Sequence, residues 1–291
     1  MQIVDKGKNF GGRMATRRPL PLAFDHGAQF FTVRSAEFRR EVDQWLAEGW
    51  AAAWFGSPGH ERYRSTNGMN GLAARLAEGH EITLGVTVRG ISPSAGGGWA
   101  VLSEGSNEPI YADALIATAP VPQTVAILGG LLTPEMHAEL RQVTYDPCLA
   151  LLVTLARPSS VPEPGYLRLD HNPAGCLAVI SDNTKKGISV GPAAVTLHST
   201  GDFARTHWES LPEAAAAAML EAAQSYLDEP AASWQLHRWR YSQPVSTYPS
   251  ACLAVQNGIA PLVLAGDAFG GPRVEGAYLS GLAAARSILN A

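Results

Sequence analysis

Two segments at opposite ends of the 291-residue chain carry side chains suited to binding a nucleotide cofactor. Near the start, a short apolar strand ends in an acid, and a glycine pair and an arginine follow. An acid in this place, at the end of the second strand of a Rossmann βαβ unit, accepts hydrogen bonds from a ribose. The arginine can neutralise a pyrophosphate. The candidate binding residues here are Asp5, Lys6, Gly11, Gly12, Arg13 and Met14.

The second segment joins a strand to a helix near the end of the chain. Residues 261–267 are an apolar run ending in an acid, which predicts a buried strand, and residues 276–289 predict a helix. A flavin needs acceptors along its ribityl chain, which Asp267 can supply, and Gly266 allows the backbone to approach closely. The helix N-terminus can stabilise negative charge at the flavin ring edge. Its candidate residues are Arg273, Val274, Glu275, Gly276 and Ala277.

Hydrophobic periodicity predicts the elements that position these two segments. Apolar residues at helical spacing indicate a helix capped by Ser35 and running to about Glu48, and a second helix over residues 69–76. Alternation predicts a single strand over residues 81–89 and a strand over 99–103 after a glycine turn. The apolar run 112–117 predicts a buried central strand.

The chain changes character between about residues 143 and 244. Four candidate strands (149–155, 176–180, 194–199 and 234–241) are separated by proline-rich turns and an alanine-rich helix over 211–227. We therefore expect an α/β protein, in which a Rossmann-type domain contains an inserted α+β substrate domain with a mainly antiparallel sheet. The expected boundaries are 1–35, 65–142 and 245–291 for the nucleotide-binding domain, and 36–64 and 143–244 for the substrate domain.

Composition gives no reason to expect a nucleic-acid or membrane partner. The net charge is -4, the aromatic residues do not alternate with a basic patch, and no apolar run is long enough to span a bilayer. Three widely spaced cysteines predict neither a disulfide framework nor a metal site, and we expect a cytoplasmic protein. The sequence does not indicate an oligomeric state.

Several other side chains are candidates for catalysis. Trp239 and Tyr241 alternate on one predicted strand, so they either line a substrate face or pack the core. Arg240 between them can meet a substrate anion or form a structural ion pair. His26, His198 and His237 can each carry protons, but structural roles are favoured for them. Residues 187–191 have the spacing of a hydrolase nucleophile elbow but lack its strand-to-helix context.

Three longer segments carry a family resemblance. Residues 10–18 (FGGRMATRR), 24–32 (FDHGAQFFT) and 266–281 (GDAFGGPRVEGAYLSG) resemble the bacterial renalase-like flavoproteins, within the flavin amine oxidase superfamily. The resemblance implies noncovalent FAD along Asp5, Arg13, Val88 and the closing helix, with Gln29 and Phe30 near the flavin. It also implies hydride transfer from a small reduced substrate to flavin N5, with O₂ as acceptor. Renalase substrates are dihydropyridine isomers of NAD(P)H, and those of the wider superfamily are amines.

The resemblance also implies a segment that would precede Met1. The first strand and Gly-rich turn of the βαβ unit, about thirty residues, are expected there. Either the coding start is misassigned, or the chain is a truncated form with weak or absent FAD affinity that acts as a non-catalytic binding protein.

Overall fold

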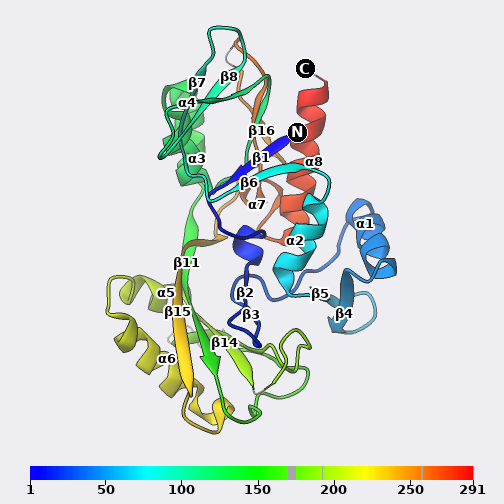
Figure 1. The fold of residues 1–291 in the computed structure, drawn as a ribbon, viewed down its shortest axis with the longest axis vertical. Coiled ribbons are helices and arrows are strands. Elements are labelled where there is room, and N and C mark those ends of the chain that lie inside the picture. Colours follow the sequence, from blue (N-terminus) through cyan, green and yellow to red (C-terminus); the bar gives the residue numbers. More distant parts are fainter. Residues whose placement is uncertain (170–174, 192, 257, 291) are drawn as a thin grey trace.

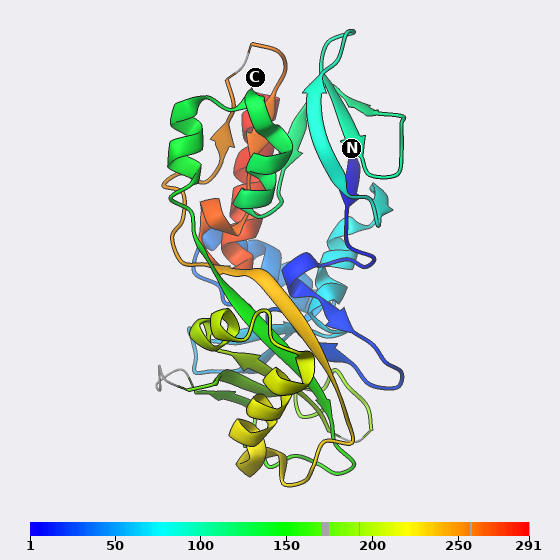
Figure 2. The same ribbon diagram turned by 90° about the vertical axis from the view of Figure 1, so that its left-hand side faces the viewer.

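Two long paired strands connect the upper and lower parts of the molecule (Figure 1). β11 (Tyr145–Thr154) and β15 (Ser233–Pro244) are antiparallel and run from the helical upper part into the lower sheet (Figure 2). The computed structural model describes residues 1–169, 175–191, 193–256 and 258–290. Both chain ends lie in the upper part.

The lower part is an antiparallel sheet with helices on one face. In the described residues its strand order is β12 (Tyr166–Arg168), β13 (Leu177–Asp182), β14 (Ala194–Ser199), β11 and β15. α5 (Gly201–Thr206) and the alanine-rich α6 (Pro212–Leu227) cover one face, where alternate apolar residues of the strands are buried. The predicted antiparallel sheet and helix are confirmed, with β11 and β15 longer than expected.

The upper part contains parallel strand pairs. β1 (Gln2–Asp5) pairs with β6 (Glu81–Leu84), and β10 (Leu115–Ala117) pairs with β17 (Leu262–Leu264), which β16 (Leu253–Ala254) joins on its other side. β17 is fully buried, as predicted.

The expected buried central strand over 112–117 is wrong. Residue 112 ends β9 (Ile110–Ala112), and β10 begins only at Leu115. Within the described residues β10 forms an edge of its sheet, which leaves Ile116 39% exposed.

The single strand predicted over 81–89 is also wrong, because the chain turns at Gly85. β6 ends at Leu84, and Gly85 has a φ of +74°, a value that favours glycine. β7 (Val88–Pro93) then pairs with β8 (Trp99–Ser103), which confirms the glycine hairpin. The alternation of apolar residues continues through the turn, so the sequence pattern gives no sign of it. α3 (Val121–Leu128) and α4 (Pro134–Leu140) follow this hairpin sheet.

Residues 11–77 form the middle of the molecule, between the two parts (Figure 1). Their elements are η1 (Gly12–Met14), β2 (Thr16–Arg17), β3 (Phe24–Asp25), α1 (Ala36–Ala47), β4 (Ala51–Phe55), β5 (Arg62–Ser65) and α2 (Met69–Ala77). Ser35 caps α1 by accepting a hydrogen bond from the Phe38 N–H, as predicted. Phe38 packs against Tyr278 of α8 (Val274–Leu289), whereas Trp54 donates to the Pro164 carbonyl of the lower part. The proposed domain boundaries at 36 and 64 therefore stay a prediction.

The closing helix α8 meets the short helix α7 (Asp267–Gly270) through glycine backbone. α8 begins two residues earlier than predicted, at Val274. A Cβ placed on Gly276 would overlap the carbonyl oxygens of Gly270 and Gly271. Only glycine allows this approach, so the position of the α8 N-terminus depends on Gly276.

We predict opposite effects for two alanine substitutions in α8. Gly276→Ala forces a methyl group against backbone, and we expect it to lower the free energy of unfolding by about 2 kcal/mol. Gly281→Ala meets no atom within 4 Å, and we expect it to raise stability by about 0.5–1 kcal/mol through helix propensity. Urea unfolding followed by circular dichroism measures both, and equal effects would contradict the close packing.

Candidate functional site

An ion pair joins the two candidate cofactor-binding segments. Arg13 Nη2 lies 2.5 Å from Asp267 Oδ1, and the side chains are 27% and 16% exposed. Arg13 also donates from Nη1 to the Ser242 carbonyl of β15, and its guanidinium lies 5.9 Å from the ring centroid of Tyr145. Residues 254 positions apart therefore meet at the junction of the upper and lower parts.

Glycines leave open space beside this ion pair. Gly12 and Gly271 have positive φ angles, and a Cβ on either would meet no atom within 4 Å. A Cβ on Gly266 would meet only the Thr118 carbonyl oxygen, at 3.8 Å. The first turn of α8 follows, and its N-cap residue Arg273 makes no side-chain cap hydrogen bond. Free amides, exposed backbone and a paired arginine fit an anionic, flat cofactor such as a flavin.

A second group of the candidate residues lies at the carboxyl end of β1. Asp5 Oδ1 accepts from the Gly7 N–H at 2.6 Å, and the Asp5 carbonyl accepts from the Val86 N–H. Lys6 Nζ donates to Gln123 Oε1 at 3.1 Å, and Val88 begins β7 two residues after Val86. The structure thus gathers Asp5, Lys6 and Val88 near one strand end. Gly11, with a φ of +106°, leads from there into η1.

Three candidate cofactor residues have partners within the protein. The Glu275 carboxylate is buried and accepts hydrogen bonds from the N–H groups of Arg34 and Ser35. It thereby fixes the chain just before α1. Met14 and Val274 pack against the aromatic cluster around Phe38. The positions of these side chains are therefore explained by packing, while Arg273 and Ala277 are exposed.

Asp25 and Lys186 form a buried ion pair that sequence reasoning missed. Lys186 Nζ lies 2.6 Å from Asp25 Oδ2, and both side chains are 0% exposed. Asp25 Oδ1 accepts from Thr16 Oγ1 and from the Met69 N–H at the start of α2. Burial lowers the pKa of Lys186, and the Asp25 carboxylate opposes that shift. No pattern indicates this pair, because the lysine lies in a charged run that is typical of a solvated loop.

Lys186 also holds the segment that contains Gln29 and Phe30. Its Nζ donates to the Gln29 carbonyl at 2.5 Å. The Gln29 side chain is 6% exposed and donates from Nε2 to the Asp25 and Gly27 carbonyls. Its Oε1 has no partner among the described residues. Phe30 packs edge-on against the rings of Phe55 and Tyr166.

Three histidines converge around Trp239, although no sequence pattern indicates that they meet. The ring centroids of His26 and His237 lie 5.4 and 4.3 Å from that of Trp239. The Trp239 indole donates to the His26 carbonyl at 2.7 Å, and His198 Nε2 lies 3.1 Å from the same oxygen. Burial, with His237 and Arg17 adding to it, lowers the pKa of His26 to about 4. The imidazole of His26 is therefore neutral at pH 7.

The residues after Trp239 do not all share its surroundings. Tyr241 lies 5.5 Å from Tyr145, ring centroid to ring centroid, which places it close to Arg13. Arg240 lies over the Trp208 ring at 5.1 Å. Trp208 packs on the helix-covered core of the lower sheet, so the structure does not bring Arg240 together with Trp239.

Ser189 lies in the loop between β13 and β14, where no helix follows, so the nucleophile elbow is not formed. Its Oγ instead accepts from the Ala23 N–H. Among the described residues, no three His, Cys, Asp or Glu side chains are grouped to hold a metal ion. Within the same ranges, no helix combines the length and apolarity needed to cross a membrane. Cys148, Cys176 and Cys252 are free thiols.

Comparison with known proteins decides the family. The family model described as flavin containing amine oxidoreductase matches residues 44–289. The chain belongs to this family. The match begins within α1 and covers the second half of the middle part, the lower part and the closing helix.

Solved structures of other oxidases share the fold. A protein assigned as a protoporphyrinogen oxidase from Exiguobacterium sp. 255-15 is 17% identical, with a TM-score of 0.62 over 81% of this chain and 54% of that one. A redesigned triple mutant of putrescine oxidase is 17% identical, with a TM-score of 0.57 over 80% of this chain and 54% of its own. Wild-type putrescine oxidase bound to putrescine is 18% identical, with a TM-score of 0.54 over 79% and 54%. The chain thus spans about half the length of the structures it matches.

We expect that removing one partner of the buried Asp25–Lys186 ion pair lowers the free energy of unfolding strongly, and that the size of the loss depends on whether the other partner is still charged. Lys186→Met leaves the Asp25 carboxylate buried without its cation and should lower the free energy of unfolding by about 3–5 kcal/mol. Lys185→Met, which changes the neighbouring lysine that is 23% exposed, should cost clearly less. In the double variant Lys186→Met/Asp25→Asn the costs should not add. Additive costs in urea unfolding would show that the pair is not coupled.

Stability should fall in mild acid because of His26. Its pKa is about 4 in the folded protein and 6.5 in an unstructured chain, so between these values the unfolded chain binds more protons. Folding stability contributed by neutral His26 is therefore present above pH 6.5 and lost as the pH falls towards 4, by about 3 kcal/mol. Urea unfolding across this range measures the loss. His26→Gln should flatten the profile, and an unchanged slope would contradict this origin.

Proposed function

We propose that this chain is part of an FAD-dependent oxidoreductase that oxidises a small reduced substrate of the dihydronicotinamide type, with O₂ as the acceptor and hydrogen peroxide as the product. The observation that supports it most is the Arg13–Asp267 pair, which joins the two nucleotide-type segments beside open glycine backbone. Membership of the flavin-containing family supports the cofactor. The dihydropyridine substrate rests on the renalase resemblance and on the charges around Trp239.

The proposed cofactor contacts follow the two groups of residues. Asp5, Lys6 and Val88 hold the adenosine end, and Gly11, Gly12, Arg13 and Met14 lie along the pyrophosphate. Asp267 and Gly266 contact the ribityl chain, and residues 273–277 direct amides of α8 to the ring edge. FAD binds without a covalent link in this proposal. When bound, it supplies a two-electron acceptor at N5.

Gln29, Trp239 and Tyr241 are proposed to line the substrate side of the ring. The Trp239 indole stacks against the ring of His26 and is met edge-on by the ring of His237, and this aromatic group is proposed to contact a planar substrate ring. The buried imidazole of His26 is neutral at pH 7 and excludes water without adding charge. The substrate ring becomes aromatic as it loses hydride, so no base is required of the chain.

The charged groups around Trp239 favour a dihydronicotinamide substrate over a protonated amine. Asp25, the residue before His26, is paired with Lys186, and Asp267, which lies near Tyr145, is paired with Arg13. Arg17 adds positive charge near His26 and His237. A protonated amine would be repelled there, whereas a neutral or anionic substrate would not.

Anaerobic stopped-flow mixing with the flavin-loaded protein tests the substrate. Dihydronicotinamide isomers should bleach the flavin absorbance, and a panel of primary amines should not. Bleaching by amines alone would favour the amine oxidase alternative. A chain that purifies colourless and takes up no FAD would favour the non-catalytic alternative.

Substitutions in the two halves of the proposed cofactor site should affect the binding of FAD and FMN differently. Asp5→Asn removes a carboxylate acceptor for the ribose of the adenosine half, so it should weaken FAD binding about ten-fold and leave FMN binding unchanged. Asp267→Asn should weaken both flavins. Fluorescence titration measures the affinities, and Asp113→Asn serves as a control. An equal effect of Asp5→Asn on FAD and FMN would contradict the assignment.

A further inference from the structure

We propose that Arg64 forms a binding site for the carboxylate of a small aromatic acid, whose ring packs against Trp54. The site lies where the ribbon of β4 and β5 meets the loop after β13. It goes beyond the proposed function, because neither residue is assigned to cofactor or substrate there. Three features support it: a guanidinium without a carboxylate partner, small residues beside that guanidinium, and aromatic rings next to it.

Arg64 is half-buried, yet no carboxylate oxygen lies within 4.0 Å of its guanidinium among the described residues. Its side chain makes one hydrogen bond within the same ranges, from Nη1 to the Ser65 carbonyl at 3.4 Å. Burial lowers the pKa of Arg64, and the Asp25 carboxylate opposes that shift. By contrast, the hydrogen bond from Arg205 to Asp146 raises the pKa of Arg205. An anion from outside would give Arg64 the partner that Arg205 already has.

The carboxylate that acts on Arg64 through space is already occupied. Asp25 Oδ2 lies 2.6 Å from Lys186 Nζ, and the positive charge of Arg64 contributes to lowering the pKa of Lys186, which burial lowers most. Two cations therefore share one carboxylate. Arg62, two residues earlier on the same face of β5, lies over the Phe55 ring at 5.5 Å and also has no carboxylate within 4.0 Å among the described residues. The uncompensated positive charge attracts an anion to this face.

Small residues leave room beside the Arg64 guanidinium. Ala52 lies opposite Arg64 in the pairing of β4 with β5. Gly187 is exposed, and a Cβ placed on it would lie 3.4 Å from Arg64 Nη2 and within 4 Å of no other group than this guanidinium. The guanidinium therefore borders an open space between the ribbon and the loop.

Aromatic rings lie next to this charge. The rings of Phe55 and Tyr166 stack with their centroids 5.2 Å apart, and Trp54 meets them edge-on at 4.9 and 5.8 Å. All three rings are half-buried. Lys186 Nζ lies 4.8 Å from the Trp54 ring centroid, so Trp54 and Arg64 approach the same lysine. A guanidinium binds a carboxylate through paired N–H donors, and an aromatic face binds a flat ring.

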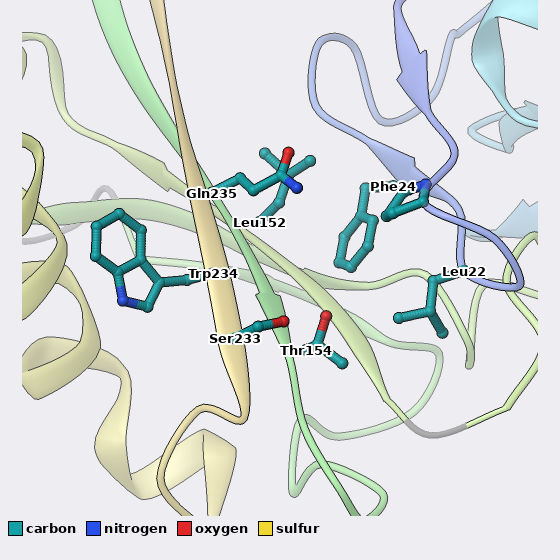
Figure 3. A pocket seen from close by; sticks show the side chains of 8 residues that line it. Leu22, Phe24, Leu152, Thr154, Ser233, Trp234 and Gln235 are labelled. Carbon is teal, nitrogen blue, oxygen red and sulfur yellow. The ribbon is translucent and has the colours of Figure 1, made fainter.

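A separate cavity offers a control for the ring of the ligand. Figure 3 shows it between β11 and β15 on one side and the segment before β3 on the other. Its volume is about 160 Å³, and none of its eight lining side chains is charged. It has room for an apolar ring but no cation to distinguish an acid from its amide. Ser233 lines this cavity and is exposed, so a larger side chain there can fill it.

Three probes test the site: benzoate, benzamide, which lacks the charge, and acetate, which lacks the ring. Calorimetry of the purified chain should show that benzoate binds at least about ten-fold more tightly than either of the others. Arg64→Gln should abolish the preference for benzoate over benzamide, because it removes the charge-assisted contact. Arg64→Lys should keep part of the preference. Trp54→Leu should weaken the binding of benzoate and leave that of acetate unchanged.

Two variants are controls. Arg75→Gln removes an arginine that is 54% exposed and paired with Glu78 on the surface, and Ser233→Phe fills the separate cavity. Both should bind benzoate as the wild type does. Circular dichroism shows that each variant is folded, and Arg64→Lys tests the site if Arg64→Gln does not fold.

Equal binding of benzoate and benzamide, or an unchanged ratio of their affinities in Arg64→Gln, would overturn the site. Loss of benzoate binding in Ser233→Phe would place the ring in the separate cavity and would overturn it as well. The measurement needs no flavin, so its result does not depend on the proposed oxidoreductase.

Discussion

The buried pair of Asp25 and Lys186 is the interaction on which the middle of the molecule depends. It joins the N-terminal hairpin, the start of α2, the Gln29 segment and the loop after β13. Two charges removed from water are costly, and this cost is offset by their ion pair and by the further hydrogen bonds that Asp25 accepts from Thr16 and Met69 and that Lys186 donates to the Gln29 carbonyl. Since the Gln29 segment covers Trp239 through His26, the pair also sets the geometry of the proposed substrate face.

Local features of the fold could be predicted because their causes are local. The Ser35 cap, the antiparallel strands and the buried β17 follow from neighbouring residues. The prediction of one strand over 81–89 was wrong because the alternation of apolar residues continues through a glycine turn. The prediction of a buried central strand over 112–117 was wrong because an apolar run does not reveal whether other strands pair with it on both sides.

The site could be predicted at its ends but not at its centre. Asp5, Arg13 and Asp267 lie in segments with nucleotide-binding patterns, and Arg13 and Asp267 do meet. Lys186 and Asp25 are 161 positions apart, and His198 and Trp239 reach His26 from 172 and 213 positions away. Contacts of this range depend on tertiary packing, and side-chain types alone give no sign of them.

The pairing of β11 with β15 contains an irregularity whose position has a consequence for evolution of the site. Opposite Asp146 lies Gln243, but opposite Cys148 lies Trp239, so extra residues of β15 loop out between them. Such a bulge absorbs changes in chain length without disturbing the ladder on either side. Insertions there could vary what surrounds Tyr241 and Arg13 while His237 and Trp239 keep their orientation. Loss of a single residue from β15 between Ser233 and Trp239 would instead exchange the two faces of the strand. Its polar side chains would then point into the helix-covered core.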